Sequence, residues 1–213
     1  MTKISPSVLA SDLSNLASEV AEIAAAGADM VHLDVMDGVF VTNMSFGMPI
    51  IESLRKKSDM VFDVHLMITK PEKYAKRFID AGADILTFHL EACEDSGALL
   101  DEIRANGVKS ALSIKPATPA EAVFPYLEKC DMILVMTVEP GYGGQSFMPE
   151  MLEKVRKIRA EIERRGLDID IQVDGGLNPE TAKLAREAGA NVIVAGSSVF
   201  KAQDRRAAID ALR

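Results

Sequence analysis

The segment AAGADMVHLDVMDG, residues 25–38, joins a helical pattern to an apolar run through a short turn. Ala25 and Ala26 end an Ala-rich helical pattern, Gly27 suits the left-handed cap position, and the polar Asp29 precedes the apolar run. The segments DAGADILTFHL, residues 80–90, and EAGANVIVAGS, residues 187–197, repeat this order. Each of the three segments therefore indicates a joint between a helix and the strand that follows it.

Outward from these joints, short apolar runs alternate with amphipathic stretches along the whole chain. The apolar runs predict eight strands, at Lys3–Leu9, Asp29–Val35, Met60–Leu66, Ile85–Leu90, Lys109–Ile114, Met132–Val138, Ile169–Val173 and Val192–Ala195. The amphipathic stretches predict helices at Leu13–Ala26, Pro49–Lys57, Pro71–Ala81, Gly97–Asn106, Pro119–Lys129, Pro149–Arg165, Pro179–Ala188 and Asp204–Leu212. Asp12 and Asn178 are candidate N-caps.

No Pro- or Gly-rich linker divides these strand–helix units, and an open doubly wound sheet usually has fewer strands. We therefore predict an α/β fold with one domain, a single (β/α)8 TIM barrel over residues 1–213. Cys93 follows the fourth strand and Cys130 precedes the sixth, which places the two thiols at opposite ends of the barrel. We expect no disulfide between them.

Composition limits the classes of function. The chain is 48% hydrophobic and 26% charged with a formal net charge of −8, which argues against a surface for nucleic acid or anionic membrane because both need clustered Lys and Arg. No apolar run approaches the roughly 20 residues that span a bilayer, and Met1–Ser7 lacks the features of a signal peptide. With only two cysteines, we expect a cytoplasmic protein.

Ionisable side chains gather where the active sites of (β/α)8 barrels lie, at the C-terminal ends of the strands. The residues that share the inward face of the second, third and seventh strands are His32, Asp34 and Met36; Asp63, His65 and Met67; and Gln172 and Asp174. Uncompensated buried charges are costly, so two His and two Asp that converge from three strands favour a metal site over a purely structural polar network. Two nitrogen and two oxygen donors suit one divalent ion, Zn²⁺, Fe²⁺, Mn²⁺ or Co²⁺, and the sequence does not choose among them.

Three Gly-rich segments follow the sixth, seventh and eighth strands on the same rim. They are EPGYGGQSF with Gly141, Gly143 and Gly144; Gly175 with Gly176; and Gly196 with Ser197. The loops after the last two strands are the usual phosphate site of this fold, and Gly lets backbone N–H groups approach an anion. Because no Lys or Arg lies among them, they indicate a phosphate held by backbone groups. The loop Gly141–Phe147 is also a candidate lid.

Other residues near the strand ends have less definite roles. His89 and Glu91, in TFHLEA, fit two interpretations equally: partners that orient a metal ligand, or rim residues that bond a neighbouring loop. Asp37 has the opposite parity to Asp34 and precedes Gly38, so we expect it to fix the turn. Three methionines fit adaptable packing or a wall that keeps water from a reactive pocket, namely Met36, Met67 and Met136.

Taken together, these segments resemble the motifs of the ribulose-phosphate 3-epimerase family over essentially the whole chain. The matching stretches are SPSVLASD, VHLDVMDGVFVTN, DVHLM, KPATP, VEPGYGGQSF, QVDGGLN and VAGSSVF. The resemblance implies a metal held by His32, Asp34, His65 and Asp174, with Asp34 and Asp174 as the two acid/base groups. It implies substrate contacts at Ser7, His65, Gly141, Tyr142, Gly143, Gly144, Gly175, Gly176, Gly196 and Ser197. Thr42 departs from the family, which usually has Pro there, and should loosen that loop modestly.

The function implied by the resemblance is an isomerase of carbohydrate metabolism that converts D-ribulose 5-phosphate to D-xylulose 5-phosphate in the pentose phosphate pathway. Inversion of a carbon next to a ketone removes its proton, passes through an enediolate that a metal can stabilise, and returns a proton to the opposite face. Asp34 and Asp174 come from strands on different sides of the pocket, so each can serve one face. The expected partner is a small-molecule sugar phosphate. We expect no binding to nucleic acid or to a membrane, and the sequence leaves open whether the chain forms a homo-oligomer.

Three alternatives remain from the sequence. A 3-epimerase of a hexulose phosphate such as D-allulose 6-phosphate would use the same metal set, although the double Gly after Asp174 and the loop at Gly141–Gly144 favour the pentulose. A decarboxylase or aldolase usually needs a Lys at a strand end, where Lys115 is the sole candidate. A catalytically silent metal-binding barrel would not need the complete acid/base pair that this chain carries.

Overall fold

One parallel eight-stranded sheet organises the computed structural model, which describes residues 2–213. The strands are β1 (Lys3–Pro6), β2 (Met30–Met36), β3 (Val61–Met67), β4 (Ile85–His89), β5 (Lys109–Ile114), β6 (Met132–Met136), β7 (Asp170–Asp174) and β8 (Val192–Ala195). Parallel ladders join β2 through β8 in sequence order and then β8 to β1. A parallel bridge between Ser7 and His32 brings β1 beside β2. The predicted (β/α)8 barrel is therefore confirmed.

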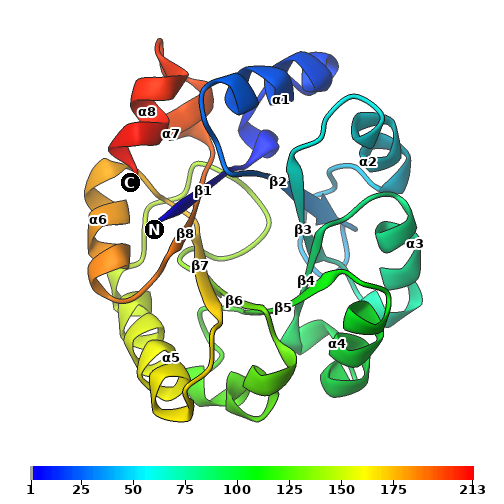
Figure 1. Cartoon of the computed structure of the whole chain (residues 1–213), viewed down its shortest axis with the longest axis vertical. Helices are drawn as coiled ribbons and strands as arrows, with labels where there is room; N and C mark the ends of the chain where they lie inside the picture. The colour runs from blue at the N-terminus through cyan, green and yellow to red at the C-terminus, as the bar shows by residue number, and fades with distance from the viewer. Residues whose placement is uncertain (1) are drawn as a thin grey trace.

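The helices form a ring outside the strands (Figure 1). The α-helices are α1 (Leu16–Ala25), α2 (Met48–Arg55), α3 (Ala75–Asp80), α4 (Ser96–Ala105), α5 (Leu152–Arg165), α6 (Pro179–Glu187), α7 (Ser197–Phe200) and α8 (Arg205–Ala211). The 3-10 helices are η1 (Val8–Ala10), η2 (Leu13–Asn15), η3 (Pro71–Lys73), η4 (Leu90–Ala92), η5 (Ala120–Lys129) and η6 (Pro149–Met151). As predicted, Asp12 caps η2 by accepting from Ser14 N, and Asn178 caps α6 by accepting from Glu180 N and Thr181 N.

Several element bounds differ from the predicted pattern, and three of the differences have a clear physical reason. β1 ends at Pro6 rather than Leu9, because η1 begins at Val8. The segment Ala120–Lys129 is a 3-10 helix that contains Pro125, whose ring clashes with an α-helical carbonyl and which has no N–H to donate. The short helix α7 was not predicted, since four residues are too few for a helical period to show in the sequence.

The repeated helix-to-strand joints have a common structural role. Their glycines have positive φ angles, 92° at Gly27, 110° at Gly82 and 112° at Gly189, as the left-handed cap requires. The polar residue that follows accepts a hydrogen bond from the backbone of the preceding strand. These bonds run from Ile4 N to Asp29 Oδ2 (2.8 Å), from Phe62 N to Asp84 Oδ2 (2.7 Å) and from Ile171 N to Asn191 Oδ1 (2.7 Å). Each joint therefore ties a new strand to the strand beside it.

The barrel has an apolar outer layer and an apolar cluster inside, near the N-terminal ends of the strands. Val31, Leu33 and Val35 face outward and belong to the main hydrophobic core together with residues of the surrounding helices, as predicted. A separate cluster of side chains fills the N-terminal end of the interior, namely Met30, Ile85, Ala111, Met132 and Val192. The buried polar side chains Asp63 and Gln172 lie above this layer, toward the C-terminal mouth, whereas the ion pair of Lys3 with Asp170 (2.6 Å) lies at the N-terminal end.

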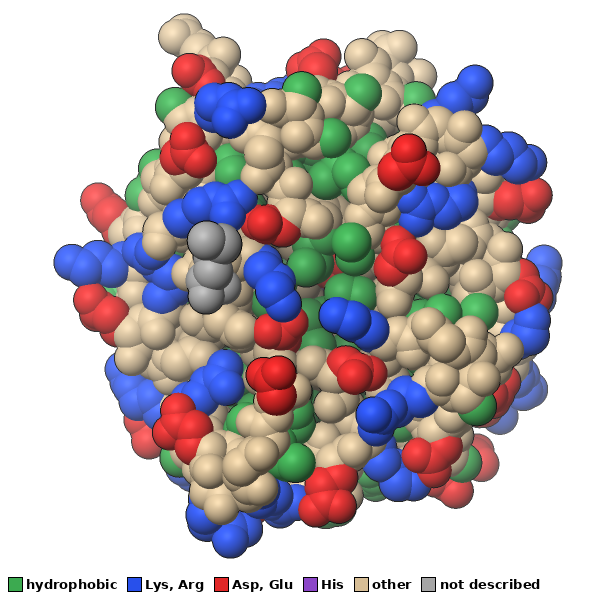
Figure 2. Space-filling view, viewed as in Figure 1, with side chains coloured by type: hydrophobic (Ala, Val, Ile, Leu, Met, Phe, Trp, Pro, Cys, Tyr) green, Lys and Arg blue, Asp and Glu red, His purple; other side chains and the backbone are tan. Residues whose placement is uncertain are grey.

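The surface carries charges of both signs, as the composition indicated. Figure 2 shows acidic and basic side chains interspersed over one face of the molecule. Within residues 2–213, none of the helices has both the length and the apolar composition that a membrane span needs.

Cys93 and Cys130 are free thiols, and burial raises the pKa of the first to about 11 and of the second to about 12, so both are poor nucleophiles at neutral pH.

Candidate active site

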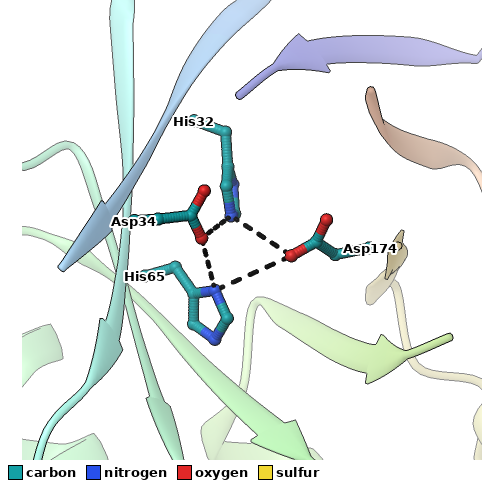
Figure 3. A group of neighbouring side chains, drawn as sticks. All are labelled: His32, Asp34, His65 and Asp174. Atoms are coloured by element: carbon teal, nitrogen blue, oxygen red, sulfur yellow. Dashed lines mark hydrogen bonds and ion pairs between the residues drawn. The ribbon is translucent and has the colours of Figure 1, made fainter. Parts of the chain in front are cut away.

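Four ionisable side chains from three strands meet at the C-terminal mouth of the barrel (Figure 3). His32 and Asp34 come from β2, His65 from β3, and Asp174 ends β7. One ligand atom of each lies within 4.8 Å of the corresponding atoms of the other three. The structure thus brings together the residues that the alternation pattern placed on the inward faces.

Strand register explains this meeting. Asp34 is paired with His65 in the ladder between β2 and β3, so their side chains point to the same face side by side. Asp174 is paired with Met136 of β6 and Val194 of β8, on the other side of the barrel. In Figure 3 its carboxylate points back across the mouth toward the two histidines.

The donor atoms have separations that suit a divalent cation. Asp34 Oδ1 lies 3.3 Å from His32 Nε2 and 3.2 Å from His65 Nδ1, and Asp174 Oδ2 lies 3.9 Å and 4.0 Å from the same two nitrogens. Ligands at about 2.1 Å from a tetrahedral ion are about 3.4 Å apart. His32 Nε2 is buried and has no hydrogen-bond partner among the described residues. A buried imidazole nitrogen that has no hydrogen-bond partner and faces two carboxylates is suited to bind a metal ion placed between them.

A buried carboxylate below the cluster fixes the orientation of His32. Asp63 Oδ2 accepts from His32 Nδ1 (2.7 Å), Gln172 Nε2 (2.6 Å) and Ser5 Oγ (2.9 Å). Because this contact holds the His32 proton on Nδ1, the lone pair on Nε2 is free to bind a metal ion. The sequence placed Asp63 and Gln172 on the inward faces without a role. Their contact joins residues 109 positions apart, which no local pattern reports.

The two carboxylates at the mouth have opposite protonation tendencies. Burial opposes the charge of Asp34, but the two nearby imidazoles outweigh it and hold the pKa of this carboxyl well below its usual range. Ser7 Oγ also donates to Asp34 Oδ2 at 2.5 Å. Burial, and then the negative charge of Asp34, raise the pKa of Asp174 to about 6. One carboxylate is therefore held ionised while the other takes up a proton near pH 6.

A cavity of about 860 Å³ opens above these carboxylates. It is lined by Asp34, Asp174 and nine of the residues expected to contact substrate, namely Ser7, Gly141, Tyr142, Gly143, Gly144, Gly175, Gly176, Gly196 and Ser197. His65, the tenth, has no exposed surface and lies behind Asp34 and Asp174. The three methionines form part of the wall, because Met36, Met67 and Met136 all line the same cavity.

One basic residue of the cavity escaped the sequence pattern. Lys201 lines the pocket beside Ser197 and Ser198, directly after α7. The Gly-rich segments were expected to hold an anion with no Lys among them, whereas the folded chain places an exposed Lys at that end. The signal was available as a Lys one helical turn after Ser197, but it is recognisable only once α7 is known.

The Gly-rich loops pack closely on one another. Gly176 has a φ of 68°, and a Cβ added there would lie 2.4 Å from the backbone N of Phe147. Only Gly lets the loop after β7 approach the loop after β6 so closely. The residue at position 176 therefore sets the spacing of the two loops over the cavity.

His89 and Glu91 make the contacts on which both interpretations of the sequence depend, one with His65 and one with the neighbouring loop. Glu91 bonds the neighbouring loop, since Oε1 accepts from Lys115 N (2.8 Å) and from Thr118 Oγ1. These bonds and His89 outweigh burial and lower the pKa of Glu91 to about 2. His89 lies against His65, with 2.9 Å between the Nε2 atoms, and burial lowers the pKa of His89 to about 4.

Asp37 fixes the turn after β2, as expected. Its Oδ1 accepts from Val39 N and Phe40 N, both at 2.8 Å. Its Oδ2 accepts from both the backbone N and the hydroxyl of Thr69 at 2.8 Å. Asp37 therefore belongs to the loop and takes no part in the cluster of Figure 3.

Comparison with known proteins gives one consistent result. A family model described as the ribulose-phosphate 3 epimerase family matches residues 3–200. The cytoplasmic isoform of ribulose-phosphate 3-epimerase from Oryza sativa subsp. japonica is 48% identical, over 99% of this chain and 92% of that protein. Ribulose-phosphate 3-epimerase from Bacillus subtilis is 42% identical, over 100% and 99%. The solved 3-keto-L-gulonate-6-phosphate decarboxylase from Vibrio cholerae is 15% identical with a TM-score of 0.74, over 100% and 96%, and shares the fold.

Proposed function

The chain belongs to the ribulose-phosphate 3-epimerase family, and from this we propose that its cavity binds D-ribulose 5-phosphate and inverts carbon 3 to give D-xylulose 5-phosphate. The resemblance inferred from the motifs is confirmed, as is the expected class of enzyme, an isomerase. The finer assignments below, which give each residue its role, are our proposal.

The observation that carries the proposal is a pair of carboxylates that reach one cavity from opposite sides of the barrel. Asp34 enters from β2 and Asp174 from β7, and both line the cavity. A planar intermediate between them would present one face to each. We assign Asp34, which the imidazoles keep ionised, to accept a proton, and Asp174, whose pKa is raised to about 6, to donate one to the opposite face. The roles exchange when the other epimer is the substrate.

Four side chains would hold one divalent ion in this site, namely His32, Asp34, His65 and Asp174. Such an ion supplies positive charge that stabilises the negative charge developing on the substrate oxygens. The N2O2 donor set is compatible with Zn²⁺, Fe²⁺, Mn²⁺ and Co²⁺. Metal analysis of protein purified without added metal identifies the ion.

The opposite end of the cavity would bind the phosphate. Gly141–Gly144, Gly175 with Gly176, and Gly196 with Ser197 line the cavity. Their backbone N–H groups can surround an anion, and Lys201 adds a positive charge beside Ser197. Met36, Met67 and Met136 contribute apolar, polarizable wall near the reacting carbons and reduce access of water there.

The rival reactions have less support. The decarboxylase or aldolase reading needs a Lys at the reacting centre, yet Lys115 Nζ lies 3.7 Å from the ring centroid of Phe40 and does not line the cavity. The family match favours the pentulose phosphate over a hexulose phosphate and a silent barrel. We also propose a cytoplasmic location, which follows the name of the rice relative.

A coupled assay tests the proposal. D-Xylulose 5-phosphate formed from D-ribulose 5-phosphate is measured before and after chelation, and again after a divalent ion is restored, with D-allulose 6-phosphate as the competing substrate. We expect activity with the pentulose that chelation removes and metal restores. Higher kcat/KM with the hexulose would contradict the proposed substrate, and full activity of metal-stripped enzyme would contradict the proposed cofactor.

A further inference from the structure

A second imidazole lies directly behind one of the proposed metal ligands. His89, the last residue of β4, places Nε2 at 2.9 Å from His65 Nε2, on the side of the His65 ring that faces away from the carboxylates. Both side chains are fully buried. Their ring centroids are 5.0 Å apart, so the two rings touch edge to edge rather than stack.

This contact decides where the protons lie. Two imidazole nitrogens at hydrogen-bond distance need one proton between them, so one nitrogen donates and the other accepts. His65 Nδ1 faces the cluster, 3.2 Å from Asp34 Oδ1. For Nδ1 to offer a lone pair to a metal, the His65 proton must be on Nε2, and His89 Nε2 must be the acceptor.

The carboxylate of Glu91 lies near the other ring nitrogen of His89, at ion-pair distance but without a hydrogen bond. When its Nε2 accepts, the proton of His89 lies on Nδ1, and Glu91 Oε2 is 3.4 Å from that atom. Glu91 is held in place by Lys115 N and Thr118 Oγ1. The ring of Phe40 lies 4.9 Å from the His89 ring, so the imidazole is held between Phe40 and His65.

The two proposed histidine ligands need opposite tautomers, and the chain gives each a different partner. His32 donates from Nδ1 to the carboxylate of Asp63 and is left with a lone pair on Nε2. His65 faces the site through Nδ1 and needs an acceptor at Nε2, where the chain supplies an imidazole. A neutral acceptor makes His65 a weaker electron donor than His32.

We propose that His89 is a positioning residue for the metal site: it accepts the Nε2 proton of His65 and thereby directs the His65 Nδ1 lone pair to the metal, while Glu91 orients His89. This inference rests on the proposed metal set. It gives the His89–Glu91 pair a function beyond the bond to the neighbouring loop. His89 is not among the residues that line the cavity or among the four candidate ligands.

The first test observes the protons directly. The chain has three histidines, and all three are in this site, so ¹⁵N-histidine NMR of the full chain with zinc shows only the imidazoles in question. We expect a proton on Nδ1 of His32, on Nε2 of His65 and on Nδ1 of His89. A proton on His89 Nε2 overturns the inference. If zinc shifts no imidazole nitrogen, the metal site itself is wrong and the inference fails with it.

The second test measures zinc affinity by competition with a chromophoric chelator. His89→Leu removes the acceptor and should weaken zinc binding by about 10- to 100-fold. His89→Gln places an amide oxygen near the position of Nε2 and should stay within about threefold of the unmodified chain. Thr87→Val is the matched control on the same strand, because Thr87 is fully buried and its hydroxyl has no hydrogen-bond partner among the described residues.

The pattern across the variants separates positioning from packing. Weak binding in His89→Leu with recovery in His89→Gln supports the inference. Equal losses in the Leu and Gln variants, or an unchanged affinity in His89→Leu, overturn it. If His89→Leu does not fold, the NMR result on the unmodified chain still decides the proton positions.

Discussion

Gly176→Ala tests the proposed phosphate end of the cavity. The φ of 68° at this position costs Ala about 1 kcal/mol. The added Cβ would also lie 2.4 Å from Phe147 N and 2.6 Å from Phe147 Cα, whereas ordinary contact begins at 3.4 Å, so the loop after β6 must retreat by about 1 Å. Backbone N–H groups of the two loops would then no longer converge on one phosphate.

The expected result is a loss of binding rather than of chemistry. Losing one hydrogen bond to a charged phosphate costs about 1.5–3 kcal/mol, which raises KM by about 10- to 100-fold. The phosphate is remote from carbon 3, so kcat should stay within about threefold. The assay is the coupled measurement of D-xylulose 5-phosphate over a range of D-ribulose 5-phosphate concentrations.

Gly166→Ala is the matched control. Gly166 caps α5 with a φ of 65°, nearly the same as at Gly176, and a Cβ there meets nothing within 4 Å. Both variants should lose about 1 kcal/mol of stability to backbone strain, or about 2–4 °C in Tm. The displaced loop adds about 1–3 kcal/mol to the loss in Gly176→Ala, and only this variant should change KM. An equal KM in the two variants, or a kcat that falls further than KM rises, would refute the reasoning.

The remaining predictions concern the carboxylates. Asp34→Asn and Asp174→Asn should each lower kcat by at least about 100-fold in the coupled assay; near-normal turnover in either would contradict the two-base scheme. Asp63→Asn keeps the shape of the side chain beside His32 but removes its charge, and should weaken zinc binding by about 10- to 100-fold in a chelator competition. An unchanged zinc affinity would contradict the proposal that Asp63 orients His32. Protonation of Asp174, whose pKa is about 6 in the metal-free chain, competes with metal binding, so zinc affinity should fall as pH falls, by about tenfold between pH 7 and pH 5; a flat profile would argue against this ligand.

The fold was readable from the sequence because its signals are local. The joint at Gly27 and its two repeats mark where helices end and strands begin, and their glycines do adopt positive φ. Strand periodicity then assigned the inward face correctly for β2, β3 and β7. The misread elements were those whose form depends on a single residue or on very short length, as with Pro125 in η5 and the four residues of α7.

The candidate site was readable only in part, because its supporting contacts join distant segments. Alternation found His32, Asp34, His65 and Asp174 at one rim, and the structure brings them together. Nothing near Asp63 in the sequence indicates that Gln172 will meet it across the barrel. In the same way, the TFHLEA segment could not tell whether His89 faces a metal ligand or a loop, since the answer depends on β3 beside it.

The difference between the two carboxylates shows how such long-range contacts create chemistry. Asp34 and Asp174 lie in the C-terminal parts of similar apolar runs, and the residues around them in the sequence do not distinguish an acid from a base. Asp34 gains Ser7, 27 residues away, as a hydrogen-bond donor and has two imidazoles close by, all of which favour its charge. Asp174 lies farther from those imidazoles, and Asp34 repels its charge. Two identical side chains therefore acquire different proton affinities because the closed barrel surrounds them with different neighbours, and a reaction that needs one donor and one acceptor depends on that inequality.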